Sequence, residues 1–310
     1  MMNKRSFLDL TVFDNHSLKE MVKLSDKLST NRFLLGDVLK QKVIALIFLK
    51  HSTRTRVSFE VAIRDLGGSV IFLGKDESQI GRGEPIKDTA RVLSGYVHGI
   101  VARLYSHESL IELAKYSTIP IINALTDYNH PVQILADLLT VYQEFKTLNV
   151  KWAYVGDGNN VTRSLVEAAS IIGFPISIAS PQGYELESEF KEKYKDFDFI
   201  TFTNDPIAAV KGSSVVYTDT WISMGQEAEK EKRILDFKNY IINKELFSYA
   251  KEDAIFLHCL PAYRGLEVSE DIMEGERSRV FKEAHNRLHS EKALLWSIYS
   301  GYLSDKILLK

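Results

Sequence analysis

Short apolar runs recur along this 310-residue chain, and stretches with helical periodicity separate them. Runs of four to eight residues rich in Val, Ile and Phe are typical of strands buried on both faces. Their alternation with helices is typical of parallel sheets. We therefore predict an α/β fold of doubly wound, parallel sheets. The predicted strands are residues 43–49, 69–74, 99–104, 119–124, 152–156, 175–179, 199–202, 214–218 and 254–259.

The predicted strands fall into two sets, which indicates two domains. Residues 130–146 have the pattern of a long helix, and a new strand begins at Trp152. We expect this helix to join two doubly wound domains. The predicted boundaries are residues 1–146 for the first domain and 147–286 for the second.

The end of the chain has the pattern of one more amphipathic helix. Leu288, Leu295 and Ile298 recur at helical spacing within residues 286–309. This helix follows a completed second sheet, so we expect it to pack back on the first domain. Residues 287–310 are therefore assigned to that first domain.

The composition is globular and argues against several classes of function. Lys and Arg number 39 against 41 Asp and Glu, so the net charge is -2 and gives no reason to expect a nucleic-acid partner. No stretch approaches the ~18 apolar residues of a membrane span, and the first residues do not resemble a signal peptide. One cysteine allows no internal disulfide, which fits a reducing compartment. We expect a cytoplasmic protein without a membrane partner.

The junction after the first predicted strand concentrates donors for an anion. Ser52 is placed to cap the following helix, whose first turn offers unpaired N–H groups. Thr53 and Thr55 add hydroxyl groups, and Arg54 and Arg56 add forked cations. These groups suit a doubly charged phosphate. The alternative is a capped surface helix with two solvated arginines.

Polar residues also follow the other strands of the first set, where ligands of doubly wound sheets bind. A loop at residues 75–85 contains Gln79 and could close over a ligand or reach a neighbouring subunit, or it could be a plain surface loop. Arg103 ends a strand and could clamp a phosphate, or it could form a structural ion pair. His130 and Gln133 share a helix face and could hold a carbonyl oxygen and an amide group, or they could simply mark a helix start.

The second domain opens on an incomplete dinucleotide fingerprint. Gly156 and Gly158 match its first two glycines, but Val161 replaces the third, and no acidic partner for a ribose follows at the expected distance. A nicotinamide-dependent dehydrogenase is therefore a weak alternative. Asn159 and Asn160 better suit the recognition of a small polar substrate.

Two later segments carry further candidates. Asp219 follows a strand and could hold an ammonium group, and Ser223 and Met224 lie on the glycine-containing segment after it. For all three, an ordinary polar loop is the alternative. Cys259 ends the last strand, a position that favours function over an inert buried thiol. We expect no metal site, because Cys259 has no second thiol and no zinc-type spacing occurs.

Taken together, these motifs resemble the aspartate/ornithine transcarbamylase family over residues 7–303. The resemblance rests on residues 52–56, on His130-Pro131-x-Gln133 and on residues 258–261, in this order and spacing. The segment from Asp219 through residues 223–225 resembles the branch that uses ornithine. Departures are Tyr263, where the family pattern has His, and Thr162 with Arg163 after Asn160. They concern only details of loop closure.

The resemblance implies roles for individual residues and an oligomer. It implies carbamoyl phosphate binding by Ser52, Thr53, Arg54, Thr55, Gln79, Arg103, His130, Gln133, Cys259, Leu260 and Arg287. It implies ornithine binding by Asn160, Asp219, Ser223 and Met224, and catalysis by Arg54, Arg103, His130, Gln133, Asp219 and Cys259. It also implies no cofactor, and a homotrimer or a multiple of trimers in which Gln79 reaches an adjacent subunit. Arg287 is expected to open the last helix.

The expected reaction is transfer of the carbamoyl group from carbamoyl phosphate to the δ-amine of L-ornithine, giving citrulline and phosphate. Asp219 and a Cys259 thiolate are expected to orient the amine as it loses its proton, and domain closure to exclude water. Aspartate, putrescine or acetylornithine as acceptor, the dehydrogenase, and a catalytically silent relative are the alternatives. The resemblance leaves open whether the reaction serves arginine synthesis or breakdown.

Overall fold

The computed structural model describes residues 6–77, 80, 83–222 and 227–302. Contacts divide the chain into two compact units. The first unit comprises Met1–Leu139 and His285–Lys310, and the second comprises Thr140–Ala284. Both divisions fall inside helices, α5 (Pro131–Phe145) and α12 (Val280–Ser300).

The described part of the first unit contains a four-stranded parallel sheet in the order β2-β1-β3-β4. Its strands are β1 (Val43–Phe48), β2 (Ser69–Gly74), β3 (Gly99–Arg103) and β4 (Ile121–Leu125). The further helices are η1 (Leu10–Val12), α1 (Asn15–Thr30), α2 (Thr53–Asp65), α3 (Ile86–Ser94) and α4 (His107–Tyr116).

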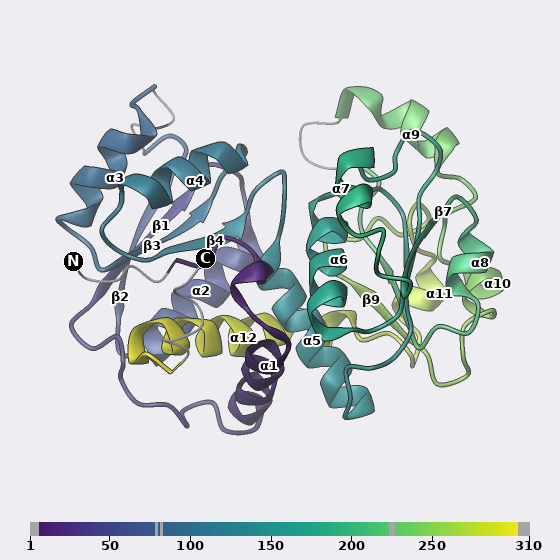
Figure 1. The fold of residues 1–310 in the computed structure, drawn as a ribbon, viewed down its shortest axis with the longest axis horizontal. Helices are drawn as coiled ribbons and strands as arrows, with labels where there is room; N and C mark the ends of the chain where they lie inside the picture. The colour runs from purple at the N-terminus through teal and green to yellow at the C-terminus, as the bar shows by residue number, and fades with distance from the viewer. Residues whose placement is uncertain (1–5, 78–79, 81–82, 223–226, 303–310) are drawn as a thin grey trace. The chain divides into compact units, whose positions relative to one another are not determined.

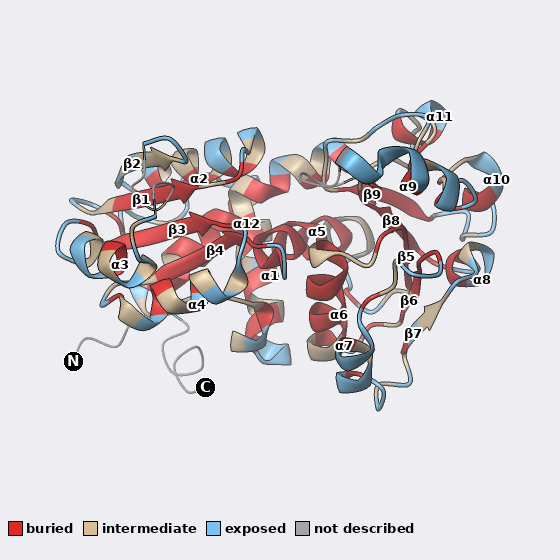
Figure 2. Ribbon diagram, turned by 90° about the horizontal axis from the view of Figure 1, so that it is seen from above, coloured by how far each residue is buried: buried red, intermediate tan, exposed pale blue. Residues whose placement is uncertain are grey.

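Helices cover both faces of this sheet (Figure 1). Ala45, Ile47 and Ile100 lie in one apolar cluster with Ala90 of α3 and Leu110 of α4. The α2 helix lies against the opposite face (Figure 1). Strand residues alternate between faces, so burial on both faces requires the continuous apolar runs seen in the sequence. Figure 2 shows the inner strands as buried, whereas the edge strand β2 is only partly buried.

The second unit contains, within the described residues, a five-stranded parallel sheet in the order β7-β6-β5-β8-β9. Its strands are β5 (Trp152–Val155), β6 (Ile176–Ala179), β7 (Ile200–Thr203), β8 (Val215–Thr218) and β9 (Ile255–His258). The further helices are α6 (Asn160–Ile172), α7 (Ser188–Lys193), α8 (Pro206–Val210), η3 (Glu227–Glu229), α9 (Lys230–Asp236), α10 (Lys244–Phe247) and α11 (Glu270–Met273).

Each face of the second sheet has its own apolar layer. Val155 and Phe256 share a cluster with Phe247 of α10 and Met273 of α11. In contrast, Trp152 stacks on the ring of Phe174 just after α6, with ring centroids 5.2 Å apart. The predicted α/β fold with two parallel, doubly wound sheets is confirmed, and the strand ends shift by only one or two residues.

The prediction for the last helix was partly wrong. The α12 helix begins at Val280, so Arg287 lies two turns inside it and does not open it. Val280, its first residue, is fully buried in the core of the second unit. The expected packing on the first domain is confirmed, because Lys292 bonds Asp65 and the Tyr299 hydroxyl donates to the carbonyl of His98.

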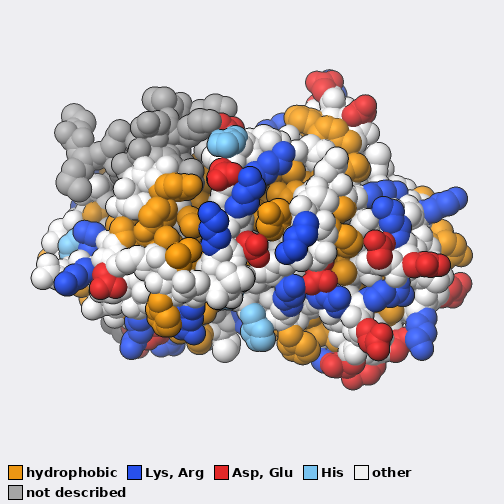
Figure 3. All heavy atoms as spheres, turned by 90° about the horizontal axis from the view of Figure 1, so that it is seen from below, with side chains coloured by type: hydrophobic (Ala, Val, Ile, Leu, Met, Phe, Trp, Pro, Cys, Tyr) orange, Lys and Arg blue, Asp and Glu red, His pale blue; other side chains and the backbone are white. Residues whose placement is uncertain are grey.

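Cationic and anionic side chains are interspersed over the face shown in Figure 3, in line with the net charge of -2. None of the helices in the described ranges is long and apolar enough to cross a membrane.

Candidate functional site

The strand orders place one switch point in each sheet, and ligands of doubly wound folds bind beyond such points. In the first unit the order reverses between β1 and β3, so the start of α2 and Arg103 at the end of β3 lie at the same edge. In the second unit it reverses between β5 and β8. The segment after β5 and Asp219 after β8 meet there.

The start of α2 is capped by Ser52, as the sequence predicted. Ser52 is the N-cap, and its hydroxyl accepts a hydrogen bond of 3.2 Å from the amide of Thr55. Thr53 and Arg54 form the first turn, where the helix dipole is positive. Arg56, predicted as a further anion donor, has its guanidinium carbon 3.6 Å from the ring centroid of Phe72. This distance is typical of a cation–π contact, and Phe72 belongs to the edge strand β2.

Arg287 is a buried hub that links three helices of the first unit. Its Nη2 donates to the hydroxyl of Thr55 (3.1 Å) and its Nη1 to Oε1 of Gln133 (2.7 Å). Gln133 in turn donates to Asp137 (2.8 Å). Glu291 accepts from Nε and Nη2 of Arg287 at 3.0 and 2.5 Å. Asp137 and Glu291 were missed from the sequence, although each lies four positions beyond a predicted site residue, on the same helix face.

His130 lies where the positive charges of the first unit converge. Burial holds its pKa well below 6.5, and the charges of Arg287, Arg103, Arg54 and Lys50 act in the same direction. His130 is therefore uncharged at neutral pH and can exchange hydrogen bonds with a carbonyl group. The field of several cations around an uncharged imidazole suits an anionic ligand.

The lowered pKa of His130 predicts a specific loss of stability in acid. Below pH 6.5 the unfolded chain takes up a proton at this position that the folded chain does not, so unfolding becomes easier as the pH falls. We expect urea titrations from pH 7.5 to 5.5 to show wild type losing up to ~1.4 kcal/mol per pH unit more than His130→Gln. Equal slopes for the two proteins would show that His130 is not held uncharged.

Lys50 is a further residue that sequence reasoning did not select. Its side chain is buried, forms an ion pair with Asp127 and lies 4.8 Å from the ring centroid of Tyr105. Its position two residues before the N-cap Ser52 was the available signal. Lys50 adds to the positive field at His130.

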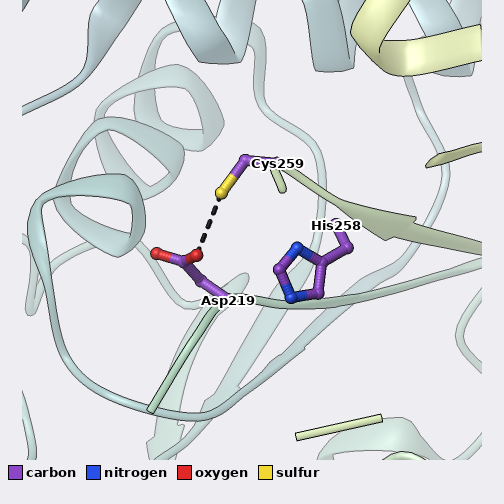
Figure 4. Close-up of side chains that lie close together, drawn as sticks. All are labelled: Asp219, His258 and Cys259. Atoms are coloured by element: carbon purple, nitrogen blue, oxygen red, sulfur yellow. Dashed lines mark hydrogen bonds between the residues drawn. The ribbon is translucent and has the colours of Figure 1, made fainter. Parts of the chain in front are cut away.

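In the second unit, Asp219 collects three hydrogen bonds. Its Oδ1 accepts from the thiol of Cys259 (3.0 Å) and from the amide of Thr220 (2.8 Å), and its Oδ2 accepts from Nδ2 of Asn159 (2.7 Å). Figure 4 shows the Cys259 sulfur directed at this carboxylate. The predicted partners Asp219 and Cys259 are thus brought together.

The two asparagines after β5 have different positions. Asn159 caps α6, and its side chain accepts from the amides of Val161 and Thr162. Asn160 is the first residue of the helix. Thr162 and Arg163, which depart from the family pattern, have structural explanations. Thr162 completes the capping box, and Arg163 pairs with Glu187.

Gly158 lies where two segments of the chain pack closely together, the turn after β5 and residues 184–186. Its amide donates to the carbonyl of Tyr184 (2.8 Å), and a Cβ atom at this position would lie 2.4 Å from the amide nitrogen of Leu186. The absence of a side chain is therefore needed for packing. This explains the glycine without a dinucleotide.

Buried polar residues fix the loop that carries Cys259 and Leu260. Nδ1 of His258 accepts from the amide of Leu260 (2.9 Å), so the ring proton lies on Nε2, which faces Glu267 at 3.2 Å. Leu260 has a φ of 59°, a left-handed conformation that costs energy for a residue with a Cβ. Glu267 also accepts from the amide of Tyr263, whose side chain is half exposed.

Asp219, His258 and Cys259 also form a group that could hold a metal ion, with one ligand atom each within 4.8 Å of one another. Both ring nitrogens of His258 are already engaged by Leu260 and Glu267. A metal ion would have to displace one of these contacts, so the donors fit a metal poorly.

Three predicted site residues, Gln79, Ser223 and Met224, lie outside the described residues.

Two family models match nearly the whole chain. The carbamoyl-P binding domain of aspartate/ornithine carbamoyltransferase matches residues 5–143, and the Asp/Orn binding domain matches residues 148–298. The chain belongs to the aspartate/ornithine carbamoyltransferase family. This membership agrees with the resemblance found in the motifs.

Individual members of the family are similar over almost their full length. The ornithine carbamoyltransferase of Caldicellulosiruptor saccharolyticus is 50% identical over 305 residues, covering 96% of this chain and 99% of that protein. The ornithine carbamoyltransferase of Archaeoglobus fulgidus is 47% identical over 297 residues, covering 94% of this chain and 96% of that protein. The solved structure of ornithine carbamoyltransferase from Pyrococcus furiosus has a TM-score of 0.91 and 42% identity, covering 97% of this chain and 98% of that one.

Proposed function

We propose that this carbamoyltransferase transfers the carbamoyl group of carbamoyl phosphate to the δ-amine of L-ornithine, giving L-citrulline and phosphate. The observation that carries the proposal is the cation-rich helix start in the first unit, where Arg287 is bonded to Thr55 and Gln133. The similar proteins named ornithine carbamoyltransferase support ornithine as the acceptor.

In this proposal the first unit binds carbamoyl phosphate. The phosphate lies at the start of α2, where backbone amides and hydroxyl groups can donate to it. His130 and Gln133 hold the carbamoyl end. The proposed ligands are Ser52, Thr53, Arg54, Thr55, Arg103, His130, Gln133 and Arg287. Roles of Gln79, Cys259 and Leu260 toward carbamoyl phosphate stay predictions.

The second unit binds ornithine in this proposal. Asp219 attracts an ammonium group, and Asn160 begins α6 directly after Asn159, which bonds Asp219. The δ-ammonium has a pKa near 10.4 when free in water and must lose a proton before it attacks. Placed at Asp219, the ammonium would replace the Cys259 thiol as hydrogen-bond donor, which lets the sulfur accept from the amine. Ser223 and Met224 are proposed as further ornithine contacts.

The reaction needs both substrates to be bound together. The amine nitrogen attacks the carbamoyl carbon, and negative charge develops on the carbamoyl oxygen. Donors aimed at that oxygen stabilise the transition state, and one donor can be worth ~10²–10³ in rate. The C–O bond to phosphate then breaks, and the phosphate can accept the proton that the amine releases. No covalent enzyme intermediate is required.

The acceptor is tested by an assay panel. We expect citrulline from ornithine, and kcat/KM at least ~100-fold lower with the other acceptors. Putrescine lacks the α-carboxylate and acetylornithine lacks the charged α-amino group, and a site built to bind such groups rejects substrates without them. Aspartate lacks the δ-amine that attacks. Product formation is followed colorimetrically for the ureido group and by phosphate release. Faster turnover of another acceptor would reassign the substrate, and no product from any acceptor would favour a silent relative.

We further propose a cytoplasmic homotrimer that acts in arginine biosynthesis. Gln79 would serve an adjacent subunit in such a trimer. Light scattering on a size-exclusion column tests the trimer. The direction of metabolism needs a separate test, because relatives from Thermoplasma are named catabolic and one from Campylobacter jejuni is named anabolic. Rescue of an arginine-requiring strain that lacks its own enzyme would support biosynthesis.

A further inference from the structure

Glu291 is a fully buried carboxyl group in direct contact with the Arg287 hub. It lies one helical turn after Arg287 on α12 and is 0% exposed. A single oxygen, Oε1, accepts from both Nε and Nη2 of Arg287. The remaining contacts of Nη1 and Nη2 are those with Gln133 and Thr55. Glu291 therefore fixes the plane in which the guanidinium faces these two residues.

The surroundings of Glu291 make its charge change with pH near neutrality. Burial raises its pKa to about 7, although the charge of Arg287 and the Ser58 hydroxyl of α2 act against this rise. Among the described residues, Arg287 is the charged group that acts on this carboxyl group. The next residue, Lys292, is instead bonded to Asp65 and to the carbonyl of Arg32.

We propose that Glu291 is a positioning residue for Arg287, and that its charge state sets how strongly the site attracts the carbamoyl phosphate dianion. An ionised Glu291 offsets the positive charge of Arg287. When Glu291 is protonated, the charge of Arg287 is no longer offset and attracts the bound anion more strongly. Binding of the dianion therefore favours uptake of a proton by Glu291. This inference rests on the proposed function, because it takes carbamoyl phosphate as the anion.

Glu291→Gln tests the inference, because the amide keeps an acceptor for Arg287 but cannot ionise. At pH 8.5 we expect its KM for carbamoyl phosphate to fall roughly three- to tenfold below that of wild type, as removal of a nearby negative charge predicts. At pH 6 the two values should agree, and the KM for ornithine should be unchanged at both pH values. Glu60→Gln is the matched control: Glu60 also pairs with an arginine four positions on, Arg64, but on an exposed face of α2.

Equal KM values for Glu291→Gln and wild type at pH 8.5 would overturn the proposal. So would a KM raised at both pH values, which would indicate that Glu291 only supports the packing. If wild type makes no citrulline, the proposed function fails, and a separate measurement still decides the inference. Calorimetry with inorganic phosphate in two buffers of different ionisation enthalpy should show less proton uptake at pH 7.5 for Glu291→Gln than for wild type. Equal uptake, or no phosphate binding by wild type, would contradict it.

Discussion

Replacing Arg287 by methionine is expected to raise the KM for carbamoyl phosphate at least ~100-fold, because a buried cation with donors to Thr55 and Gln133 is lost. The same change should cost about 3–5 kcal/mol of unfolding free energy at pH 8, since it leaves Glu291 buried without its partner. Below pH 6 the cost should shrink, because burial raises the pKa of Glu291 to about 7 and the carboxyl group is then protonated. Urea unfolding and initial-rate kinetics measure the two effects.

The double variant Arg287→Met with Glu291→Met separates affinity from stability. Two apolar side chains of similar length remove the unpaired charge, so most of the lost unfolding free energy should return. The affinity for carbamoyl phosphate should not return. Recovery of both, or a normal KM in the single variant, would show that Arg287 is structural and does not bind the anion.

Replacing Asp219 by asparagine is expected to lower kcat/KM for ornithine by ~10²–10³, with the KM for carbamoyl phosphate within about twofold of wild type. The carboxylate accepts from Cys259, Thr220 and Asn159, and an amide group cannot accept at all of these positions. The substitution also removes the negative charge that attracts an ammonium group. Kinetics with each substrate varied in turn measure the two constants.

A matched control and a contradicting result exist for this change. Asp253→Asn makes the same substitution at an exposed position of the second unit and should leave both constants unchanged. If Asp219→Asn instead changed the KM for carbamoyl phosphate and left ornithine kinetics normal, Asp219 would not be the ammonium partner.

The local structure of several predicted site residues could be read from the sequence because their signals are local. Ser52 was identified as an N-cap from its place before a helix, and the structure has its hydroxyl on the amide of Thr55. Asp219 and Cys259 were selected because each follows an apolar strand, and they are in hydrogen-bond contact. The carboxyl ends of parallel strands lie at the same edge of the sheet. A residue's place just after a strand was therefore sufficient to predict that it lies at this edge.

Other contacts could not be read from the sequence because they depend on partners that are distant along the chain. Arg56 belongs to the same motif as Arg54, but a neighbouring strand supplies the ring of Phe72 on which it lies. Gly158 resembled part of a nucleotide fingerprint until the approach of residues 184–186 explained it. Glu291 gave no signal beyond its spacing from Arg287, since a charged residue on a helix is usually exposed.

The sequence by itself determined the alternation of strands and helices, the capped start of α2 and the order of the motifs. Burial of apolar runs and the capping of helix ends act over a few residues, so they can be read locally. Only the tertiary structure decided that Arg287 meets Thr55, 232 positions earlier in the chain, and that Glu291 lies buried beside it. The physical reason is that strand order and helix packing determine which distant residues come into contact. Both depend on the assembly of the whole sheet. Glu291 thereby became an internal counter-charge within the proposed anion site.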